Sequence, residues 1–575
     1  MKHLSFYIII SLFGFHVLGL SFAPVIAQTP QYCATKFKGD SDCAADTSAK
    51  SITLLDYAIW YGEFINGCSA TNLSGCGTNA DATDTAMDAN FNYAGTNYIL
   101  TDSKVDTFDY AVWIQGYLAQ QQTGTTPTVI PTGSTPIPTT TTTVTPPLSN
   151  GGSFPGAEGY GSQSKGGRGG KVMYVTNLND SGAGSLRDCM ESSGARTCVF
   201  KVGGTITLNG RINVTNPYLT VAGQSAPGGI QIKMSGTSGD AIQITTHNVI
   251  LRYLTIRPGT LGVNSRALSI SAGSGATRPN SAHDVIVDHL STSWSEDEQL
   301  IAWYDTYNVT IQNSLIAEGL TSGVQKGPNL GGGGNGGIGG PYTFYGNAVA
   351  LFYQRMPRVR VSKAGEDIVD IVNNLIYNPT WNGNYNGAYL SDGGRVNLIG
   401  NYVKVPSGTV DYYMYIESGQ VYAKSNITPK RPTDSGSESA GVVSGSVAST
   451  PFTPASGAKA VSSPKTPQNA YDTALTSVGN SAGLDCTGNW VARRDTLDTR
   501  IINDIRNGTG SLKTSAGPWP TYTGGTACPD SDNDGMSDTW ETAKGLAVGT
   551  ADNNADPDND TYTNLEEYLN GTSPK

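Results

Sequence analysis

The stretch Asn308-Val-Thr-Ile-Gln-Asn-Ser-Leu-Ile316 alternates apolar and polar residues and then bends at small polar residues. Segments of the same design occupy residues 248–257, 284–292, 342–349, 370–377 and 395–402. They recur at roughly 25 to 35 residues, with wider spacing where loops intervene, which is a solenoid period. One unit cannot bury its apolar face alone, so coils must stack, and asparagines at equivalent bends can hydrogen-bond along the stack. The pattern predicts an all-β parallel β-helix over residues 153–526.

A β-sandwich is the alternative fold for this region. A sandwich would favour tight hairpin turns, but Asn-Gly pairs, which signal such turns, are not the dominant turn residues in this sequence. Charged residues make up only 14 % of the chain and Gly numbers 71, which suits turn-rich β structure better than a helical bundle. The formal net charge of −11 argues against general binding of nucleic acid or anionic membranes. It would also repel an acidic polysaccharide, unless cations or a local basic cluster reverse the field at the site.

The first residues have the pattern of a secretion signal. Lys2 and His3 precede an apolar run over residues 4–20, and Val25-Ile-Ala27 offers small residues for cleavage after Ala27. A membrane anchor is the alternative, but the run is short, is interrupted by glycine and histidine, and has no second apolar span after it. We therefore expect residues 1–27 to be a signal peptide and the mature chain to be secreted, with no membrane span.

The 8 cysteines fall into four close neighbourhoods along the chain. In a secreted protein this suggests disulfides between near neighbours. None of the cysteines has the CxxC spacing of a zinc site, so no zinc is expected. The neighbourhoods are Cys33 with Cys43, Cys68 with Cys76, Cys189 with Cys198, and Cys486 with Cys528.

Residues 28–122 contain a loose tandem, in which residues 52–60 match residues 105–113. Acidic and amide residues precede each half, and an acidic loop followed by an amphipathic helix is the design of a calcium loop-helix unit. The pair resembles dockerin repeats with degenerate ligand spacing, which implies a cohesin-type or cell-surface partner; a purely structural accessory module is the alternative. Residues 123–152 are rich in Thr and Pro and predict an extended linker.

The tail, residues 527–575, carries two acidic loops in tandem. Each loop places oxygen-bearing side chains at positions 1, 3, 5, 9 and 12, as in an EF-hand. The predicted Ca2+ ligands are Asp530, Asp532, Asp534, Asp538 and Glu541 in the first loop, and Asp556, Asp558, Asp560, Asn564 and Glu567 in the second. We expect these paired loops to be structural and to fold only with metal bound; a simple acidic tail is the alternative.

Two aspartates and a set of basic residues carry the chemistry expected of the β-helix. Asp284 and Asp288 stand four apart in one predicted strand, so both side chains point to one face and can hold a hard cation, although solvated surface is the commoner fate of such a pair. Lys326 and the arginines of Arg355-Met-Pro-Arg-Val-Arg360 follow on later coils. Because coils stack, these groups are expected to converge. The chain has only 5 histidines, which makes a histidine-based triad hard to assemble, and His289 is interpreted as a core or turn residue.

Seven segments, in this order and spacing, resemble the pectate lyase family of right-handed parallel β-helix enzymes. They are Phe154-Pro-Gly-Ala-Glu-Gly-Tyr-Gly161, residues 166–180, Gly184-Ser-Leu-Arg187, residues 221–229, Val287-Asp-His289, Ser293-Trp-Ser-Glu-Asp-Glu298 and the arginine segment 355–360. The calcium-loop tail also resembles tails attached to bacterial lyases of this kind.

The resemblance implies a role for each matching residue. Asp284 and Asp288 would be calcium ligands at the substrate site, and Arg355 would abstract the C5 proton of a galacturonate. Arg360 would bind the substrate carboxylate, with Lys326 and Arg358 beside it. The implied activity is β-elimination of polygalacturonate, a pectic polysaccharide, with calcium and cationic side chains neutralising the developing charge.

Two alternatives remain open. Related pectate lyases carry an aspartate ligand near the position that aligns with Arg266, whereas pectin lyases, which cleave methylated chains without calcium, place arginine in that region. Substrate preference is therefore open between the two. A non-catalytic glycan-binding or adhesion module is compatible with flanking calcium modules, but adhesion alone would not require Arg355 and Arg360.

Overall fold

The computed structural model describes residues 152–575, apart from short gaps at 237–238, 272–276, 321–324, 333–338, 363–367, 379, 383–386 and 455–456. The expected signal peptide, the dockerin-like tandem and the linker lie outside the described residues, as do the first two cysteine pairs. The described residues all belong to one compact unit. Within the part of the chain that is described, no helix is both long and apolar enough to cross a membrane.

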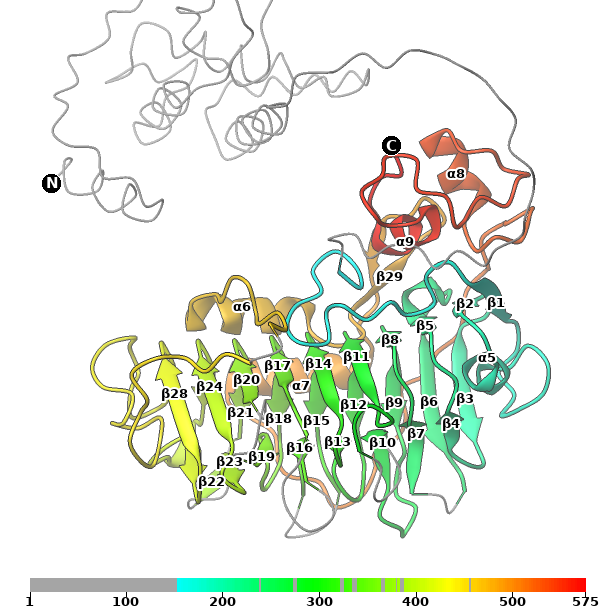
Figure 1. The fold of residues 1–575 in the computed structure, drawn as a ribbon. Helices are drawn as coiled ribbons and strands as arrows, with labels where there is room; N and C mark the ends of the chain where they lie inside the picture. Colours follow the sequence, from blue (N-terminus) through cyan, green and yellow to red (C-terminus); the bar gives the residue numbers. More distant parts are fainter. Residues whose placement is uncertain are drawn as a thin grey trace, which may run out of the picture. The chain divides into compact units, whose positions relative to one another are not determined.

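Three long sheets, built entirely from parallel pairs, make up the body of the protein (Figure 1). The first sheet contains, in spatial order, β1 (Lys171–Val175), β2 (Arg196–Phe200), β5 (Leu219–Ala222), β8 (Val249–Arg252), β11 (His283–Asp288), β14 (Tyr307–Gln312), β17 (Tyr342–Tyr345), β20 (Ile368–Val372), β24 (Arg395–Ile399) and β28 (Gln420–Lys424). The second contains β3 (Gly204–Leu208), β6 (Ile230–Met234), β9 (Thr255–Arg257), β12 (Ser291–Ser293), β15 (Leu315–Ala317), β18 (Ala348–Ala350), β21 (Leu375–Tyr377) and β25 (Tyr402–Lys404). The third contains β4 (Ile212–Val214), β7 (Asp240–Ile244), β10 (Arg266–Ser271), β13 (Leu300–Trp303), β16 (Asn329–Gly331), β19 (Arg358–Arg360), β23 (Ala388–Ser391) and β27 (Met414–Ile416).

The chain visits the first, second and third sheets in turn and then begins the next coil. This path is a parallel β-helix, so the predicted architecture is confirmed. Side chains alternate along each strand, and the inward ones, such as Val285 and Val287 of β11, are fully buried in one continuous core. Two short pairs lie outside the main sheets: β22 (Thr380–Asn382) with β26 (Ser407–Thr409), and β29 (Ala482–Leu484) with β30 (Trp490–Ala492).

Each repeated sequence segment forms two strands rather than one. In the segment 308–316, β14 belongs to the first sheet and β15 to the second, and Asn313 and Ser314 make the bend between them. Asn313 has a φ of 50°, the left-handed conformation that turns the chain sharply and that asparagine tolerates better than most residues. The small polar residues that follow the apolar run therefore mark an internal corner of each coil.

Buried asparagines form a hydrogen-bonded ladder at this corner, as the sequence predicted. Asn347, Asn374, Asn401 and Asn426 are fully buried and occupy successive coils. The Oδ1 atom of Asn374 accepts from the backbone N–H of Asn347 at 3.0 Å, and the Oδ1 atom of Asn401 accepts from that of Asn374 at 2.9 Å. The ladder thus pairs backbone groups that the bend removes from the sheets.

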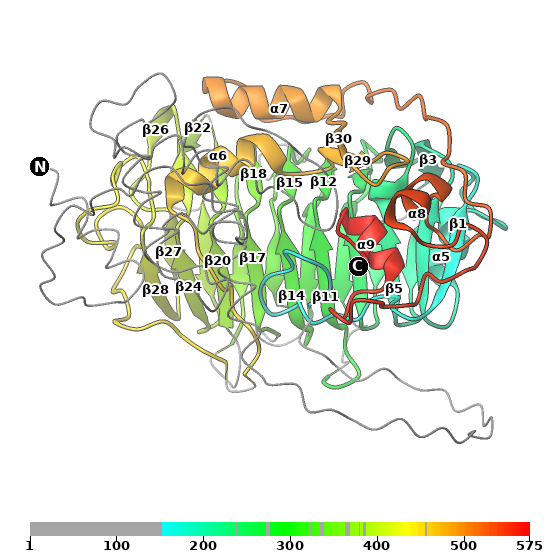
Figure 2. The same ribbon diagram turned by 90° about the horizontal axis from the view of Figure 1, so that it is seen from above.

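Covering segments protect two of the three sheets. Residues 152–170 cross the first sheet, where the backbone N–H of Gly161 donates to Thr310 Oγ1 at 2.8 Å. Helices α6 (Pro467–Ser477) and α7 (Thr496–Asn507) lie beside the second sheet (Figure 2), and their buried apolar residues pack against β15, β18 and β21. From residue 387 the chain therefore extends the β-helix as far as β28 and wraps it afterwards.

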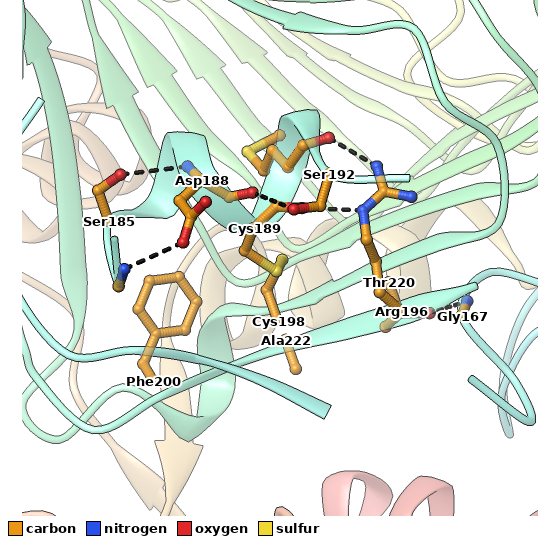
Figure 3. The surroundings of a disulfide bond; sticks show 12 residues. Gly167, Ser185, Asp188, Cys189, Ser192, Arg196, Cys198, Phe200, Thr220 and Ala222 are labelled. Atoms are coloured by element: carbon orange, nitrogen blue, oxygen red, sulfur yellow. Dashed lines mark hydrogen bonds between the residues drawn. A yellow bond between two sulfur atoms is a disulfide. The ribbon is translucent and has the colours of Figure 1, made fainter. Parts of the chain in front are cut away.

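The first coil is closed by helix α5 (Leu186–Glu191), whose residues Leu186, Cys189 and Met190 are buried. A disulfide joins Cys189 to Cys198 of β2 (Figure 3), and a second joins Cys486 to Cys528, which confirms two of the expected pairings. The guanidinium of Arg196 donates to the backbone oxygens of Cys189 at 2.8 Å and Met190 at 2.6 Å. Since the last carbonyls of a helix have no partner within it, this buried arginine satisfies the end of α5.

Asp370 of β20 makes stability depend on pH. Burial raises the pKa of Asp370 to about 6, although Asn397 and Tyr160 act to lower it. The folded state holds this proton more tightly than the unfolded state, so the contribution of Asp370 to stability is greatest below pH of about 4 and is lost as pH rises through about 6. Asp370→Asn is expected to raise the free energy of unfolding at pH 8 by about 2–3 kcal/mol and to change it little at pH 4. Urea denaturation at the two pH values measures this.

The exposed Asp411 provides the control for that prediction, because its carboxylate pairs with Lys430 at the surface and 62 % of the side chain is exposed. Asp411→Asn should have little effect at either pH. An equal effect of Asp370→Asn at pH 4 and pH 8 would show that burial does not hold the carboxyl in its neutral form.

Candidate active site

Charged side chains gather where five successive coils pass from the second sheet into the third. Asp240 and Arg266 begin β7 and β10, and β10 pairs with β7 so that these two residues are partners in register. Asp297 and Glu298 lie in the turn before β13, Lys326 precedes β16, and Arg355 precedes β19. We call these six residues the junction cluster.

Arg266 is the centre of the junction cluster and contacts all three of its carboxylates. Its Nη1 lies 3.3 Å from Asp240 Oδ1, its Nε lies 3.1 Å from Glu298 Oε2, and its Nη2 forms an ion pair with Asp297. Lys326 Nζ lies 2.6 Å from Asp297 Oδ1, and Arg355 pairs with Glu298. Three carboxylates thus face three cations, which leaves the cluster close to electrical neutrality.

Burial and charge act in opposite directions on the cluster carboxyls. Burial tends to raise the pKa of Asp297, but hydrogen bonding from Lys326 and the charge of Arg266 outweigh it and hold that pKa below its ordinary value. Burial prevails at Asp240, whose pKa is raised despite the nearby Arg266. Arg266 is itself kept protonated, because Glu298 and the two aspartates raise its pKa against the effect of burial.

The arginine segment lies directly beside the cluster. Arg355 has a φ of 67°, a strained conformation for a non-glycine residue and one that is often retained at functional sites. Arg358 lies on β19 with its guanidinium 5.2 Å from the centre of the Tyr389 ring, and its buried Nε has no hydrogen-bond partner among the described residues. Burial lowers the pKa of Arg358, and the charges of Arg355 and Arg360 lower it further. Arg360 Nε lies 2.9 Å from Asp392 Oδ2.

An open pocket of about 200 Å³ is lined by Gln354, Arg355, Arg358 and Tyr389. Two arginines and an aromatic ring at one opening suit a sugar that carries a carboxylate: guanidinium groups bind carboxylates in a bidentate manner, and an aromatic face can pack against a pyranose ring. The expectation that Lys326, Arg355, Arg358 and Arg360 share one region is confirmed by this arrangement of adjacent coils.

The expected convergence of Asp284 and Asp288 with these arginines is wrong. Both aspartates lie on β11 of the first sheet, whereas the cluster lies at the entry to the third sheet. Asp288 is 1 % exposed, and its carboxylate is already held by Arg252 at 2.9 Å and His289 at 2.9 Å, with further hydrogen bonds from Gln312 and Asn313.

Asp284 is likewise occupied, by His283 at 2.8 Å and by Asn308 at 2.9 Å. The error has a physical cause: position within a coil decides which sheet a residue joins, and loops of unequal length hide that position in the sequence. His289 stacks on Tyr253 with ring centres 4.6 Å apart, as expected of a turn residue.

No protein-family model matches the chain. A protein of Aspergillus flavus named "Probable pectate lyase C" is 34% identical over 437 residues, which cover 73% of this chain and 94% of the relative. The chain belongs to the pectate lyase family. A protein of the same name from Aspergillus terreus is 33% identical over 432 residues, with 73% and 94% covered. Homology therefore makes the protein a polysaccharide lyase and sets aside the non-catalytic adhesion alternative.

Solved structures also align with part of the chain. One from Bacillus sp. N165, in complex with trigalacturonate, covers 56% of this chain and 98% of its own length at 19% identity, with a TM-score of 0.37. The cedar pollen allergen Jun a 1 covers 56% of this chain and 92% of its own, at 16% identity and a TM-score of 0.39.

Three acids of the lyase's junction cluster were not predicted as site residues. Asp297 and Glu298 stand inside a segment that carries the family resemblance, but nothing in their spacing links them to Lys326 or Arg355. Asp240 precedes Arg266 by one coil, and only the register of β7 with β10 reveals the contact.

The lyase also carries carboxylate clusters in its C-terminal module, around helices α8 (Asp538–Lys544) and α9 (Asn564–Asn570). Ligand atoms within 4.8 Å of one another come from Asp530, Asp532 and Asp534, from Asp534, Glu541 and Asp552, and from Asp556, Asp558 and Asp560. Asp538 does not join a cluster; its carboxylate accepts two hydrogen bonds from Ser531, each 2.7 Å long. Asp552, from outside the predicted loops, takes a place in the second cluster.

Proposed function

We propose that this secreted enzyme cleaves polygalacturonate by β-elimination and releases unsaturated oligogalacturonides. The observation that supports this best is the pocket lined by Arg355 and Arg358: the junction cluster beside it is close to electrical neutrality, and Arg358 adds a positive charge there in a chain whose formal net charge is −11. An acidic polysaccharide would be drawn to that region although the protein as a whole repels it. The disulfides agree with an extracellular setting.

The proposed reaction begins with removal of the C5 proton of a galacturonate by Arg355. The electrons of the C5–H bond form the C4–C5 double bond, and the C4–O bond to the neighbouring sugar breaks. The departing oxygen takes a proton from solvent. Abstraction builds a second negative charge on the uronate carboxyl group, which Arg358 and Lys326 would stabilise, while Arg360 orients the chain. No water attacks carbon, so the paired carboxylates of a hydrolase are not required.

Arg355 can act as a base only if its neighbours disfavour its proton, since arginine is normally always protonated. Arg358 and Lys326 supply positive charge beside it. Arg355 must also leave Glu298 to reach substrate. Glu298 keeps a cationic partner when that happens, because Arg266 Nε lies 3.1 Å from it. The ion pair with Glu298 therefore positions Arg355 in the free enzyme, and Arg355 can leave it without stranding an unpaired carboxylate. Because the base must be deprotonated, activity should rise toward alkaline pH.

The junction cluster fits poorly as a protein-held calcium site. Its three carboxylates are the oxygen donors that calcium prefers, but Arg266 contacts each of them and the cluster charges already balance. A divalent cation would have to displace this arginine. No step of the proposed mechanism is therefore assigned to calcium in the cleft; Arg266 supplies the fixed positive charge there.

Arg266→Ala is expected to lower kcat/KM on polygalacturonate by about 10- to 100-fold in the presence of a chelator. The substitution leaves three carboxylates with two cations, so added Ca2+ should bind there and restore part of the activity. The ultraviolet absorbance of unsaturated uronates, followed with and without Ca2+, measures both effects. Arg506→Ala, on the exposed face of α7, is the charge-matched control. Complete loss of wild-type activity in chelator, with circular dichroism unchanged, would show that the cleft needs a metal after all.

Methylated pectin is a second candidate substrate, and Arg266 is the observation that favours it. A cleft that carries its own cation does not need calcium to bridge free carboxylates. The same absorbance assay on methylated pectin and on polygalacturonate separates the two substrates. An absorbance rise on neither substrate would overturn the lyase proposal, and reducing ends without absorbance would indicate hydrolysis.

A further inference from the structure

The first loop of the C-terminal module gathers carboxylates around buried oxygen atoms that have no partner. Asp534 belongs both to the group with Asp530 and Asp532 and to the group with Glu541 and Asp552, so the two groups form one continuous cluster. Glu541 is fully buried, and both of its carboxylate oxygens lack a hydrogen-bond partner among the described residues. The same is true of both oxygens of Asp532. A buried, unpaired carboxylate costs several kcal/mol, which a bound cation would remove.

The second loop repeats this arrangement. Glu567 is 1 % exposed, and within the described part of the chain both of its carboxylate oxygens and the buried Oδ1 of Asn564 have no hydrogen-bond partner. Glu567 stands at position 12 of the loop that begins with Asp556, Asp558 and Asp560, where a calcium loop places its last ligand.

The backbones of the two loops match at the same position. Gly535 has a φ of 97° and its N–H donates to Asp530 Oδ2 at 3.2 Å; Thr561 has a φ of 90° and its N–H donates to Asp556 Oδ2 at 3.0 Å. Glycine normally fills this sharp turn in calcium loops. The loops are also joined, because Asn564 Nδ2 donates to Asp552 Oδ1 at 3.1 Å, and Asp552 belongs to the first cluster.

The module packs on the N-terminal end of the first sheet, near β1, β2 and β5 (Figures 1 and 2). The apolar contact joins Met536, Trp540, Leu565, Tyr568 and Leu569 to Val172, Tyr174, Val199 and Ala222. Trp540 and Met536 are each 1 % exposed. Both lie within the first loop, between its first predicted ligand Asp530 and its last predicted ligand Glu541, so the apolar contact depends on loop shape.

Polar contacts connect the ligands to the β-helix. The hydroxyl of Tyr174 on β1 donates a hydrogen bond to Asp530, which is a member of the first cluster. Arg168, in the segment that crosses the first sheet, lies 2.8 Å from Glu566, next to Glu567. Arg252 of β8 donates to Asn570 Oδ1 at 2.6 Å. The disulfide Cys486–Cys528 fixes the start of the module covalently. It does not cross-link the two loops, so the loop conformation can still depend on bound metal.

We propose that the module binds two calcium ions and that these ions hold it as a clamp on the first coils of the β-helix. The first ion would be bound by Asp530, Asp532, Asp534, Glu541 and Asp552, and the second by Asp556, Asp558, Asp560, Asn564 and Glu567. Binding gathers each loop around its ion and places Trp540 and Leu565 against β1 and β2. The proposal does not depend on the cleft chemistry.

Calcium titration calorimetry on the full chain, after chelation, tests the two sites. Glu541→Gln and Glu567→Gln should each remove one high-affinity site relative to wild type, with apparent Kd at that site raised at least about 100-fold. Comparison with wild type is needed because other parts of the chain can also bind calcium. Asp411→Asn removes an exposed carboxylate elsewhere and should retain every site. Unchanged stoichiometry in both glutamine variants would overturn the assignment.

Hydrogen exchange on the wild-type full chain tests the clamp without depending on whether a variant folds. Removing calcium should speed amide exchange in β1 and β2 by at least about 10-fold, while β20 and β24 stay protected, and magnesium should not replace calcium. Loss of bound calcium with no change in β1 would overturn the clamp. Lyase assays separate this result from the cleft proposal, because Arg355→Ala should keep both ions and the protection of β1.

Discussion

Replacing Arg355 with alanine is expected to lower kcat on polygalacturonate by about 1000-fold or more, while the melting temperature changes little. The side chain lines the pocket and is the group proposed to take the C5 proton, so its loss removes the chemical step. Its ion-pair partner Glu298 retains Arg266 at 3.1 Å, which limits the structural cost. Single-turnover absorbance assays at alkaline pH measure the rate of the chemical step, and thermal denaturation measures the melting temperature.

Two companion variants separate catalysis from general loss of positive charge. Arg506→Ala removes an exposed arginine of α7 and should leave kcat unchanged. Glu298→Gln removes the carboxylate that holds Arg355 in the free enzyme, so Arg355 no longer has to break this ion pair to reach substrate and kcat/KM should not fall as it does in Arg355→Ala. If folded Arg355→Ala keeps more than a tenth of wild-type kcat, Arg355 is not the base.

The sequence predicted the β-helix because its signal is local and repeated. The bend residues of each coil, such as Asn374, appear at regular intervals, and their ladder in the structure is the contact the pattern implied. The division of each segment into two strands was missed. An apolar run that continues through a left-handed corner looks like one strand in the sequence. An asparagine such as Asn313, with a φ of 50°, can mark such an internal corner or the end of a strand, and the sequence does not distinguish the two.

The cleft could be predicted only in part, because its members come from different coils. Lys326 and the arginines were found through their order along the chain, and the stack does bring them together. Asp284 and Asp288 were predicted to bind a cation because they are four residues apart, but spacing within a strand says nothing about which sheet that strand joins. Asp240 meets Arg266 through register alone, and register depends on loop lengths that carry no pattern of their own.

The calcium loops show the opposite case, in which a contiguous motif nearly fixes the ligand set. Glu541 and Glu567 were expected at the last loop position, and each is buried with unpartnered oxygens. The exchange of Asp538 for Asp552 could not be foreseen. Asp538 begins α8 and bonds to Ser531, whereas Asp552 reaches the cluster from the connection between the loops, where no spacing rule applies.

Asn374→Ala is expected to lower the free energy of unfolding by about 3–5 kcal/mol, the largest single effect on stability that we predict. Its Nδ2 donates to Phe344 O at 2.8 Å and Val372 O at 3.1 Å, and its Oδ1 accepts the backbone N–H of Asn347 at 3.0 Å. Alanine removes all three hydrogen bonds, and water cannot replace them at a fully buried site. Urea and thermal denaturation of the full chain measure the loss.

Two further substitutions determine whether lost hydrogen bonds or lost volume destabilise the ladder. Ser314 occupies the equivalent corner of an earlier coil, and its Oγ accepts the backbone N–H of Leu290 at 3.1 Å, as Asn374 Oδ1 does for Asn347. Asn374→Ser can keep one such bond and should therefore cost less than Asn374→Ala, although both leave space. Asn503→Ala, on the exposed side of α7, should have little effect. Equal losses of unfolding free energy in the serine and alanine variants would mean that the volume filled by the Asn374 side chain, and not its hydrogen bond to a backbone group, makes the ladder stabilising.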